Sequence, residues 1–271
     1  MTPKRGFSGG LGRIWAIALN TFREAARIRV LYGIVVLALG ANLLAIVLGQ
    51  MSIHEQQRVT RDIGLSSISL FGSMTAIFLG VFLLYTEVQR RTIHAIVSKP
   101  IERWEFVVGK YLGMAVVLTV LVAIFAVAMS AMLTSQGVGV SVQLLRAIAL
   151  AWMEVLTVAA IAIFFSSFST PFLSGIFALA MWALGRVTPD IEAAIKTGSP
   201  WIRNTASIAL EIVPDIHLFS PSARIIDGTA ASIHGDFVTW GYVGLASLHG
   251  LGWIIGLLAM ACLLFQRRDF A

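Results

Sequence analysis

The side chains that could perform chemistry are sparse in this chain, and their spacing argues against a catalytic site. Cys262 is the only cysteine, which excludes an internal disulfide and a multi-cysteine metal site. Gly109 and Lys110 are not followed by Ser or Thr, and no glycine stands five residues before Gly109, so they do not form a phosphate-binding loop. The histidines are scattered, without an H-E-x-x-H pattern, at His54, His94, His217, His234 and His249. We therefore expect no catalytic, cofactor-binding or metal-binding residue in the chain.

Two ionisable residues lie deep within apolar stretches. Glu154 stands in the run ALAWMEVLTVAAIA, and His249 lies at comparable depth in the last apolar run. A charged residue at the bilayer centre costs about 2.5–3.5 kcal/mol on insertion scales, so it normally faces protein or water. Glu154 and His249 are therefore candidates for an intramembrane pathway, and a structural hydrogen bond between helices is the alternative for Glu154. We expect the small and polar residues Gly40, Asn42, Gly113, Thr157 and Gly175 to serve helix packing.

The elements that must position these residues are membrane-spanning helices. Hydrophobic residues make up 58% of the chain and charged residues 13%, whereas a soluble domain carries about 25% charged residues. The apolar runs are about 20 residues long without alternation, which favours helices over a barrel. The predicted fold class is an all-α polytopic membrane protein, with a single domain over residues 1–271. Its six spans are predicted at 30–49, 65–86, 111–133, 143–165, 172–187 and 238–265.

The distribution of basic residues predicts the topology. Six Lys and Arg lie in the N-terminal segment, five in the loop 87–110 and two at the C-terminus, against seven in the segments of the other side. By the positive-inside tendency, both termini and the loop 87–110 are predicted to be cytoplasmic. We ascribe the net charge of +6 to this topology, so no nucleic-acid partner is expected.

Two further segments have distinct patterns. In residues 11–28, polar side chains share one helical arc, which predicts an amphipathic helix lying in the membrane interface; packing on a soluble partner is the alternative. Residues 188–237 form an outer segment that is too long for a turn and too apolar for a free linker. Short helices are predicted at Ile191–Lys196 and Trp201–Val213, either as re-entrant helices in the outer leaflet or as an outer cap.

The polar loop 87–110 predicts a short helix held between two spans. Lys99 precedes Pro100 and is therefore disfavoured in the α region, and Pro100 suits the first turn of a new helix. That helix continues as IERWEFVVGK into the third span. A charged helix in this position is a docking surface that transmits motion; a basic loop that only determines topology is the alternative.

The residues of this loop resemble those of the permeases of type-2 ABC transporters, the ABCG-like export class. The loop of that family reads approximately E-x-x-x-[RG]-T, then P-[IV]-x-R, then G-K. The matching residues here are Glu87, Arg91, Thr92, Lys99, Pro100, Ile101, Arg103, Phe106, Gly109 and Lys110, while the family's usual glycines near Arg91 are replaced. The family also has an amphipathic connecting helix, six spans and an elaborated outer loop before the sixth span, so the resemblance covers nearly the whole chain.

The resemblance implies a transport subunit without an ATP site of its own. Lys99 to Phe106 would be the coupling helix, seated in a groove of a separate ATPase chain that binds ATP and Mg²⁺. The residues expected at this contact are Glu87, Arg91, Lys99, Pro100, Ile101, Arg103, Trp104, Glu105 and Phe106. Two copies of the chain, or the chain and a related permease, would form a dimer in lipid. The expected function is export of an unidentified substrate. The alternatives are an ATPase-coupled subunit that signals to or assembles a periplasmic partner, and a membrane-embedded enzyme.

Overall fold

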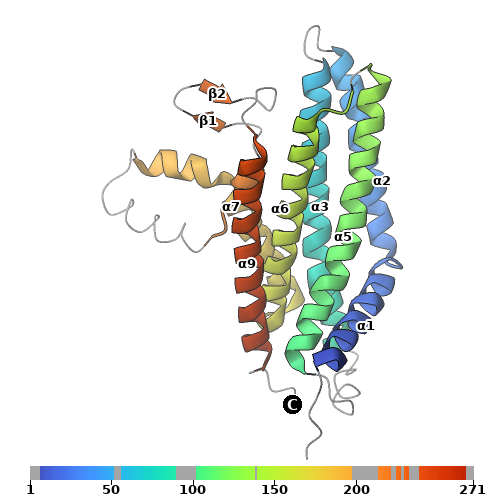
Figure 1. Ribbon diagram of the computed structural model, residues 1–271, viewed down its shortest axis with the longest axis vertical. Coiled ribbons are helices and arrows are strands. Elements are labelled where there is room, and N and C mark those ends of the chain that lie inside the picture. The colour runs from blue at the N-terminus through green and yellow to red at the C-terminus, as the bar shows by residue number, and fades with distance from the viewer. Residues whose placement is uncertain are drawn as a thin grey trace, which may run out of the picture.

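The computed structural model describes residues 7–51, 56–89, 102–137, 139–196, 213–220, 224–226, 229–231 and 238–266 (Figure 1). The described part consists almost entirely of helices. In chain order they are α1 (Phe7–Ala25), α2 (Arg29–Met51), α3 (Gln56–Gln89), α5 (Arg103–Ser135), α6 (Val142–Phe168), α7 (Pro171–Lys196) and α9 (Trp240–Gln266). A 3-10 helix, η1 (Ile216–Phe219), and a small antiparallel pair of strands, β1 (Arg224–Ile226) and β2 (Thr229–Ala231), lie between α7 and α9.

Six of these helices are long and apolar enough to cross a membrane, which confirms the predicted all-α polytopic fold. The qualifying stretches are Arg29–Gln50, Thr60–Leu83, Arg103–Ser135, Val142–Phe168, Pro171–Thr188 and Trp240–Leu264. The third stretch begins eight residues before the predicted Tyr111, because α5 continues without interruption through the charged residues Glu105 and Lys110. The sequence did not predict the three-residue strands β1 and β2.

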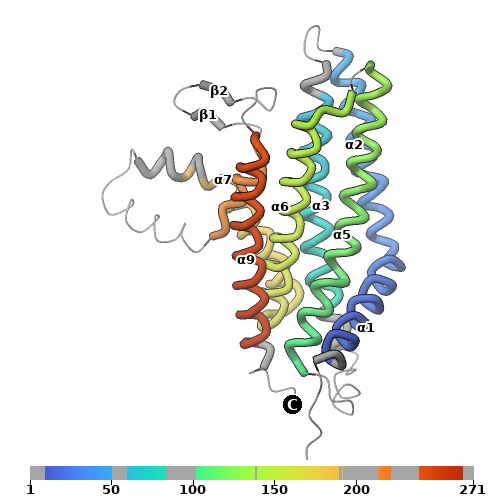
Figure 2. Tube along the Cα trace, in the orientation of Figure 1, coloured from blue at the N-terminus to red at the C-terminus, as the bar shows by residue number. Residues whose placement is uncertain are grey.

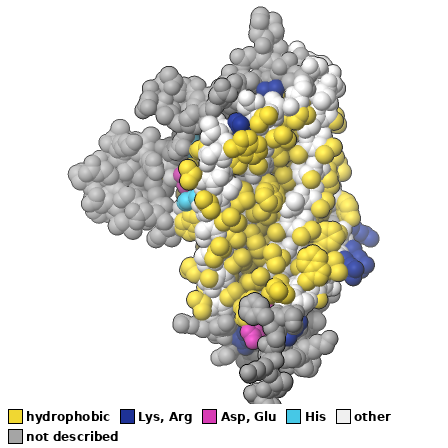
Figure 3. All heavy atoms as spheres, in the orientation of Figure 1, with side chains coloured by type: hydrophobic (Ala, Val, Ile, Leu, Met, Phe, Trp, Pro, Cys, Tyr) yellow, Lys and Arg dark blue, Asp and Glu magenta, His cyan; other side chains and the backbone are white. Residues whose placement is uncertain are grey.

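Helix α6 lies at the centre of the bundle. It contacts α3, α5, α7, α9 and η1, and it is the most buried of the six span-length helices. Helices α2, α7 and α9 are the least buried and expose most of their apolar side chains. In Figure 3 hydrophobic side chains cover most of the lateral face in view, and Lys and Arg lie at its margins. Such a surface is the one that lipid or another apolar surface would cover.

The two ends of the bundle carry different elements. Helix α1, the start of α5 and the C-terminal end of α9 lie at one end (Figures 1 and 2). The C-terminal end of α2, the start of α3, the α5–α6 turn and the β1–β2 pair lie at the opposite end. The α5–α6 turn contains Gly137 with φ 76°, a conformation that favours glycine, and Ser141 then caps α6 by accepting a hydrogen bond from the Leu144 amide.

Helix α7 leaves the direction of the bundle near its C-terminal end, which projects sideways in Figure 1. Pro189 lies inside this helix, where a proline removes one backbone hydrogen bond and bends the chain. The predicted helix Ile191–Lys196 is the last part of α7 rather than a separate element. The predicted helix Trp201–Val213 lies outside the described residues except for Val213.

Candidate functional site

The predicted docking loop is only partly described. Arg91, Lys99, Pro100 and Ile101 lie outside the described residues, and Glu87 belongs to the last turn of α3. Arg103, Trp104, Glu105 and Phe106 form the first turn of α5 itself, with Glu102 as the N-cap residue. The described part of the predicted coupling helix is therefore continuous with a span-length helix, so that a displacement of this turn would move α5 directly.

Glu105 joins this first turn to α1. Its side chain accepts a hydrogen bond from the Glu102 amide and completes a capping box at the start of α5. The same carboxylate accepts two hydrogen bonds from Arg13, at 2.6 Å from Nη2 and 3.0 Å from Nε, and Glu105 is only 2% exposed. The hydrogen bond to Glu105 raises the pKa of Arg13 above its usual value, so the guanidinium stays charged at any physiological pH.

A second ion pair joins the same two helices one turn further along α5. The Lys110 Nζ lies 3.4 Å from Glu24 Oε2, and Lys110 also lies over the Phe106 ring at 5.8 Å from its centroid. Lys110 is buried, which a lysine tolerates when its ammonium is paired. Helix α1 is thus attached to α5 by two charge pairs. In the first pair the basic residue belongs to α1 and the acidic residue to α5, and in the second pair this order is reversed.

Two glycines bring the backbones of α1 and α5 together between these pairs. A Cβ atom at Gly109 would lie 2.8 Å from Ile17 Cβ, and one at Gly113 would lie 2.4 Å from the carbonyl oxygen of Ala18. Only glycine permits so close an approach, as in the small-xxx-small contacts of membrane helices. The prediction that Gly113 serves helix packing is confirmed, whereas Gly40 and Gly175 have no atom within 4 Å of a Cβ position among the described residues.

These contacts change which residues face outward at this end. Trp104 is 40% exposed and Arg103 is also exposed, so both lie on the surface at this end. Phe106 is only 7% exposed and belongs to the hydrophobic core, and Glu105 faces α1. Glu105 and Phe106 are thus already buried by their own chain, and the expectation that these two side chains also contact a partner chain stays a prediction.

A second polar cluster lies within the bundle around Glu154, which is 1% exposed. One carboxylate oxygen accepts hydrogen bonds from Arg186 at 2.9 Å and Trp182 at 3.1 Å, and the other accepts one from Ser69 at 2.7 Å. Arg186 also donates to the Ser69 hydroxyl at 2.6 Å and to that of Ser220 at 3.4 Å. The cluster therefore joins α3, α6, α7 and the residue that follows η1.

The sequence placed Arg186 with the basic residues of the outer side and did not predict its pairing with Glu154. Trp182 and Arg186 are four residues apart on α7 and so share one face of that helix. The signal available in the sequence was the combination of one acid deep in one span and one arginine near the end of the next. A cavity of about 20 Å³ lies beside the pair, which is room for a single water molecule.

His249 does not join this cluster. Among the described residues the Glu154 oxygens have Ser69, Trp182 and Arg186 as partners. His249 is exposed on α9 at one wall of a shallow apolar groove, with its ring centroid 6.5 Å from that of Trp253. The described residues also contain no group of His, Cys, Asp or Glu side chains arranged to hold a metal ion.

The family comparison agrees with this architecture. A family model described as ABC-2 family transporter protein matches residues 15–270, which is nearly the whole chain. The comparison with curated proteins finds no significant match.

Proposed function

Because the chain belongs to the ABC-2 transporter family, we propose that it moves a substrate outward across the bacterial plasma membrane with energy from a separate ATPase subunit. The family makes the chain a multi-pass permease subunit of an ABC transporter. Export, coupling to the ATPase and the location of both termini in the cytoplasm belong to the proposal. ATP and Mg²⁺ would bind to the ATPase, and two permease chains would assemble side by side in lipid.

The observation that carries the proposal is the attachment of α1 to the first turns of α5. Two ion pairs and two glycine contacts join these helices directly beside the exposed residues Arg103 and Trp104. A partner that displaced this end would move α5 and α1 together, because packed helices with buried charge pairs shift as units rather than deform. Since α5 is itself span-length, that displacement would reach the interior of the bundle.

Trp104 provides the test of ATPase coupling. A large aromatic side chain buried at an interface commonly contributes about 2 kcal/mol or more, equivalent to more than tenfold in affinity. Trp104→Ala should therefore reduce co-purification of the ATPase at least about tenfold at equal membrane expression, and Arg103→Ala should reduce it less, since rim charges contribute mainly to association rate. Quantitative pull-down from detergent-solubilised membranes measures both.

Trp15→Ala is the matched control, because Trp15 is also an exposed tryptophan at this end but lies on the outward face of α1. It should leave ATPase binding unchanged. Phe106→Ala should lower the stability of the chain itself, by about 3–5 kcal/mol, because it opens a cavity in the core. If Trp104→Ala and Trp15→Ala both retain the ATPase and its activity, Trp104 does not contribute to coupling.

A further inference from the structure

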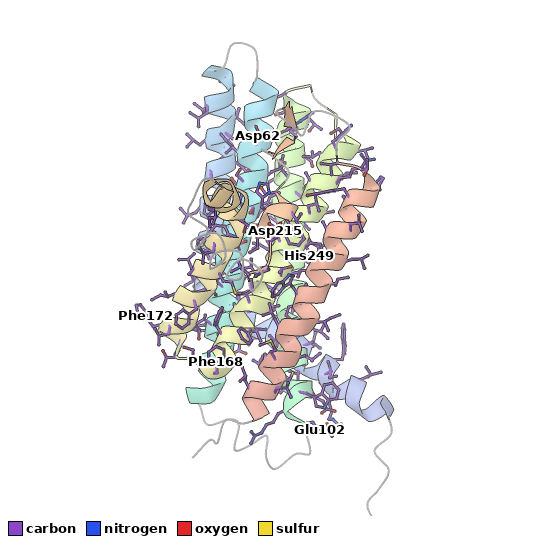
Figure 4. All side chains as sticks on the ribbon, turned by 90° about the vertical axis from the view of Figure 1, so that its left-hand side faces the viewer. Asp62, Glu102, Phe168, Phe172, Asp215 and His249 are labelled. Carbon is purple, nitrogen blue, oxygen red and sulfur yellow. The ribbon has the colours of Figure 1, made fainter. Side chains whose placement is uncertain are left out.

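The segment Val213–Ser220 is inserted into the bundle rather than laid on its end. Ile216 and Phe219 are 0% and 2% exposed, and both belong to the hydrophobic core. Figure 4 shows Asp215, in the same segment, near mid-height of the bundle and close to the level of His249. The segment contacts α6 and α7 through η1 and reaches α9 through Phe219 and Leu218.

Two glycines make room for this segment. A Cβ atom at Gly185 of α7 would lie 2.4 Å from the Pro214 carbonyl oxygen. A Cβ atom at Gly250 of α9 would lie 2.9 Å from the ring of Phe219. The segment therefore packs closely against α7 and α9 at these two glycines.

Arg186 is the residue that connects the segment to the polar cluster of the bundle. One of its terminal nitrogens contacts Glu154 and Ser69, and the other contacts Ser220 at the end of the segment. A further polar contact with the bundle is the hydrogen bond from the Tyr242 hydroxyl to the Leu218 carbonyl oxygen, at 2.8 Å. Because the guanidinium is held by Glu154, its position, and with it that of Ser220, depends on the ion pair.

The insertion also leaves polar groups incompletely satisfied. Asp215 Oδ1 is buried without a hydrogen-bond partner among the described residues. The water-sized cavity beside Glu154 is lined by Ser220 and Phe219 as well as by Arg186. A buried polar atom without a partner favours the state in which water reaches it, so Asp215 Oδ1 favours withdrawal of the segment.

We propose that the Glu154–Arg186 pair acts as a latch that holds segment 213–220 in the bundle and closes its end opposite α1. When Arg186 releases Ser220, the segment withdraws, and water gains access to Glu154 between α6, α7 and α9. Closure of this kind depends on residues of the chain alone and not on the ATPase partner.

The first test measures solvent access to Ile216 in native membranes. Cys262→Ala removes the only native thiol, and Ile216→Cys introduces one at a fully buried position. A membrane-impermeant maleimide should label this cysteine slowly in the otherwise native chain. Arg186→Gln should increase the labelling rate about tenfold or more, the change expected from losing one charge-assisted hydrogen bond.

Arg146→Gln is the matched control. Arg146 is another arginine bordering the same end, but it donates to the Val238 carbonyl oxygen and lies over the Trp240 ring instead of contacting the segment. Its loss should leave labelling unchanged. Equal labelling of the Arg186→Gln and Arg146→Gln chains would overturn the proposal.

A double substitution separates latch release from misfolding. Glu154→Gln with Arg186→Gln leaves no unpaired buried charge, so the chain should remain folded while the latch is lost. In the Cys262→Ala background, Ile216→Cys should then react with the maleimide about as fast in this double-neutral chain as in the Arg186→Gln chain. A folded double-neutral chain that protects Ile216→Cys as well as native Glu154 and Arg186 do would also overturn the latch.

Discussion

Arg186 shows how a single residue alters the interpretation of an intramembrane charge. Considered alone, Glu154 is an acid at a costly depth and therefore a candidate for a transport pathway. With Arg186, Trp182 and Ser69 around it, the carboxylate has a charge partner and two further hydrogen-bond donors. A structural role and a gating role then coincide, because the same pair stabilises the bundle and holds segment 213–220.

At this scale we predict that Glu154 and Arg186 are strongly coupled in stability. Removing one member of a buried ion pair costs about 3–5 kcal/mol, because the other charge remains buried and unpaired. Glu154→Gln and Arg186→Gln should each destabilise the chain by this order, and the double variant should lose clearly less than the sum. A double-mutant cycle on the denaturation of the purified chain in detergent measures the coupling. Additive losses would contradict the pairing.

At the scale of elements, the contact between α1 and α5 is decided by where glycines occur. Gly109 and Gly113 are one helical turn apart on α5 and face α1 at backbone-contact distance. Along α1, the residues that these glycines contact lie between Arg13, which pairs with Glu105, and Glu24, which pairs with Lys110. The exposed side of α1, which includes Leu11 and Trp15, lies outside this contact.

We therefore expect Gly113→Ala to displace α1 from α5. The added methyl group would lie 2.4 Å from a backbone carbonyl oxygen, which cannot move without shifting α1, and overpacking of this kind costs about 1–3 kcal/mol. Gly40→Ala on α2 is the control, since nothing lies within 4 Å of its Cβ position; it should be neutral or slightly stabilising. Thermal unfolding in detergent compares the two variants. Equal thermal stability of the two variants would show that the α1–α5 contact accommodates the added methyl group without loss of stability.

At the scale of the whole molecule, the bundle has two chemically distinct ends. One end carries α1, the exposed Arg103 and Trp104 and the C-terminal end of α9; the opposite end carries the β1–β2 pair (Figure 1). Combined with the distribution of basic residues, this arrangement assigns the first end to the cytoplasm in our proposal.

A reporter that is active only in the cytoplasm tests this orientation. Fused after Ala271 it should be active, and inserted after Lys196, at the end of α7, it should be inactive. The physical reason is that positively charged segments are retained on the cytoplasmic side during insertion. A reporter of opposite sensitivity at the same two positions is the control. An active cytoplasmic reporter at Lys196 would refute the proposed topology.

The sequence by itself determined the class of the molecule. Uninterrupted apolar runs of spanning length leave the helix as the structure that satisfies every backbone group in lipid, and six such helices are present. The loop motif and the order of elements pointed to the ABC-2 family, which the family model matches over residues 15–270. These properties depend on local composition and chain order, so they are accessible without three-dimensional information.

Only the tertiary structure decided which side chains meet. Glu105 and Phe106 could be assigned to a short helix between two spans from sequence, but whether they face a partner or α1 depends on how α1 packs. Arg186 is 32 residues from Glu154 along the chain, and Ser220 is a further 34 residues on. Hydropathy and periodicity describe one helix at a time, whereas these contacts depend on the rotation and depth of several helices relative to one another. That relative placement, set by glycine contacts and buried charge pairs, makes Arg186 rather than His249 the partner of Glu154.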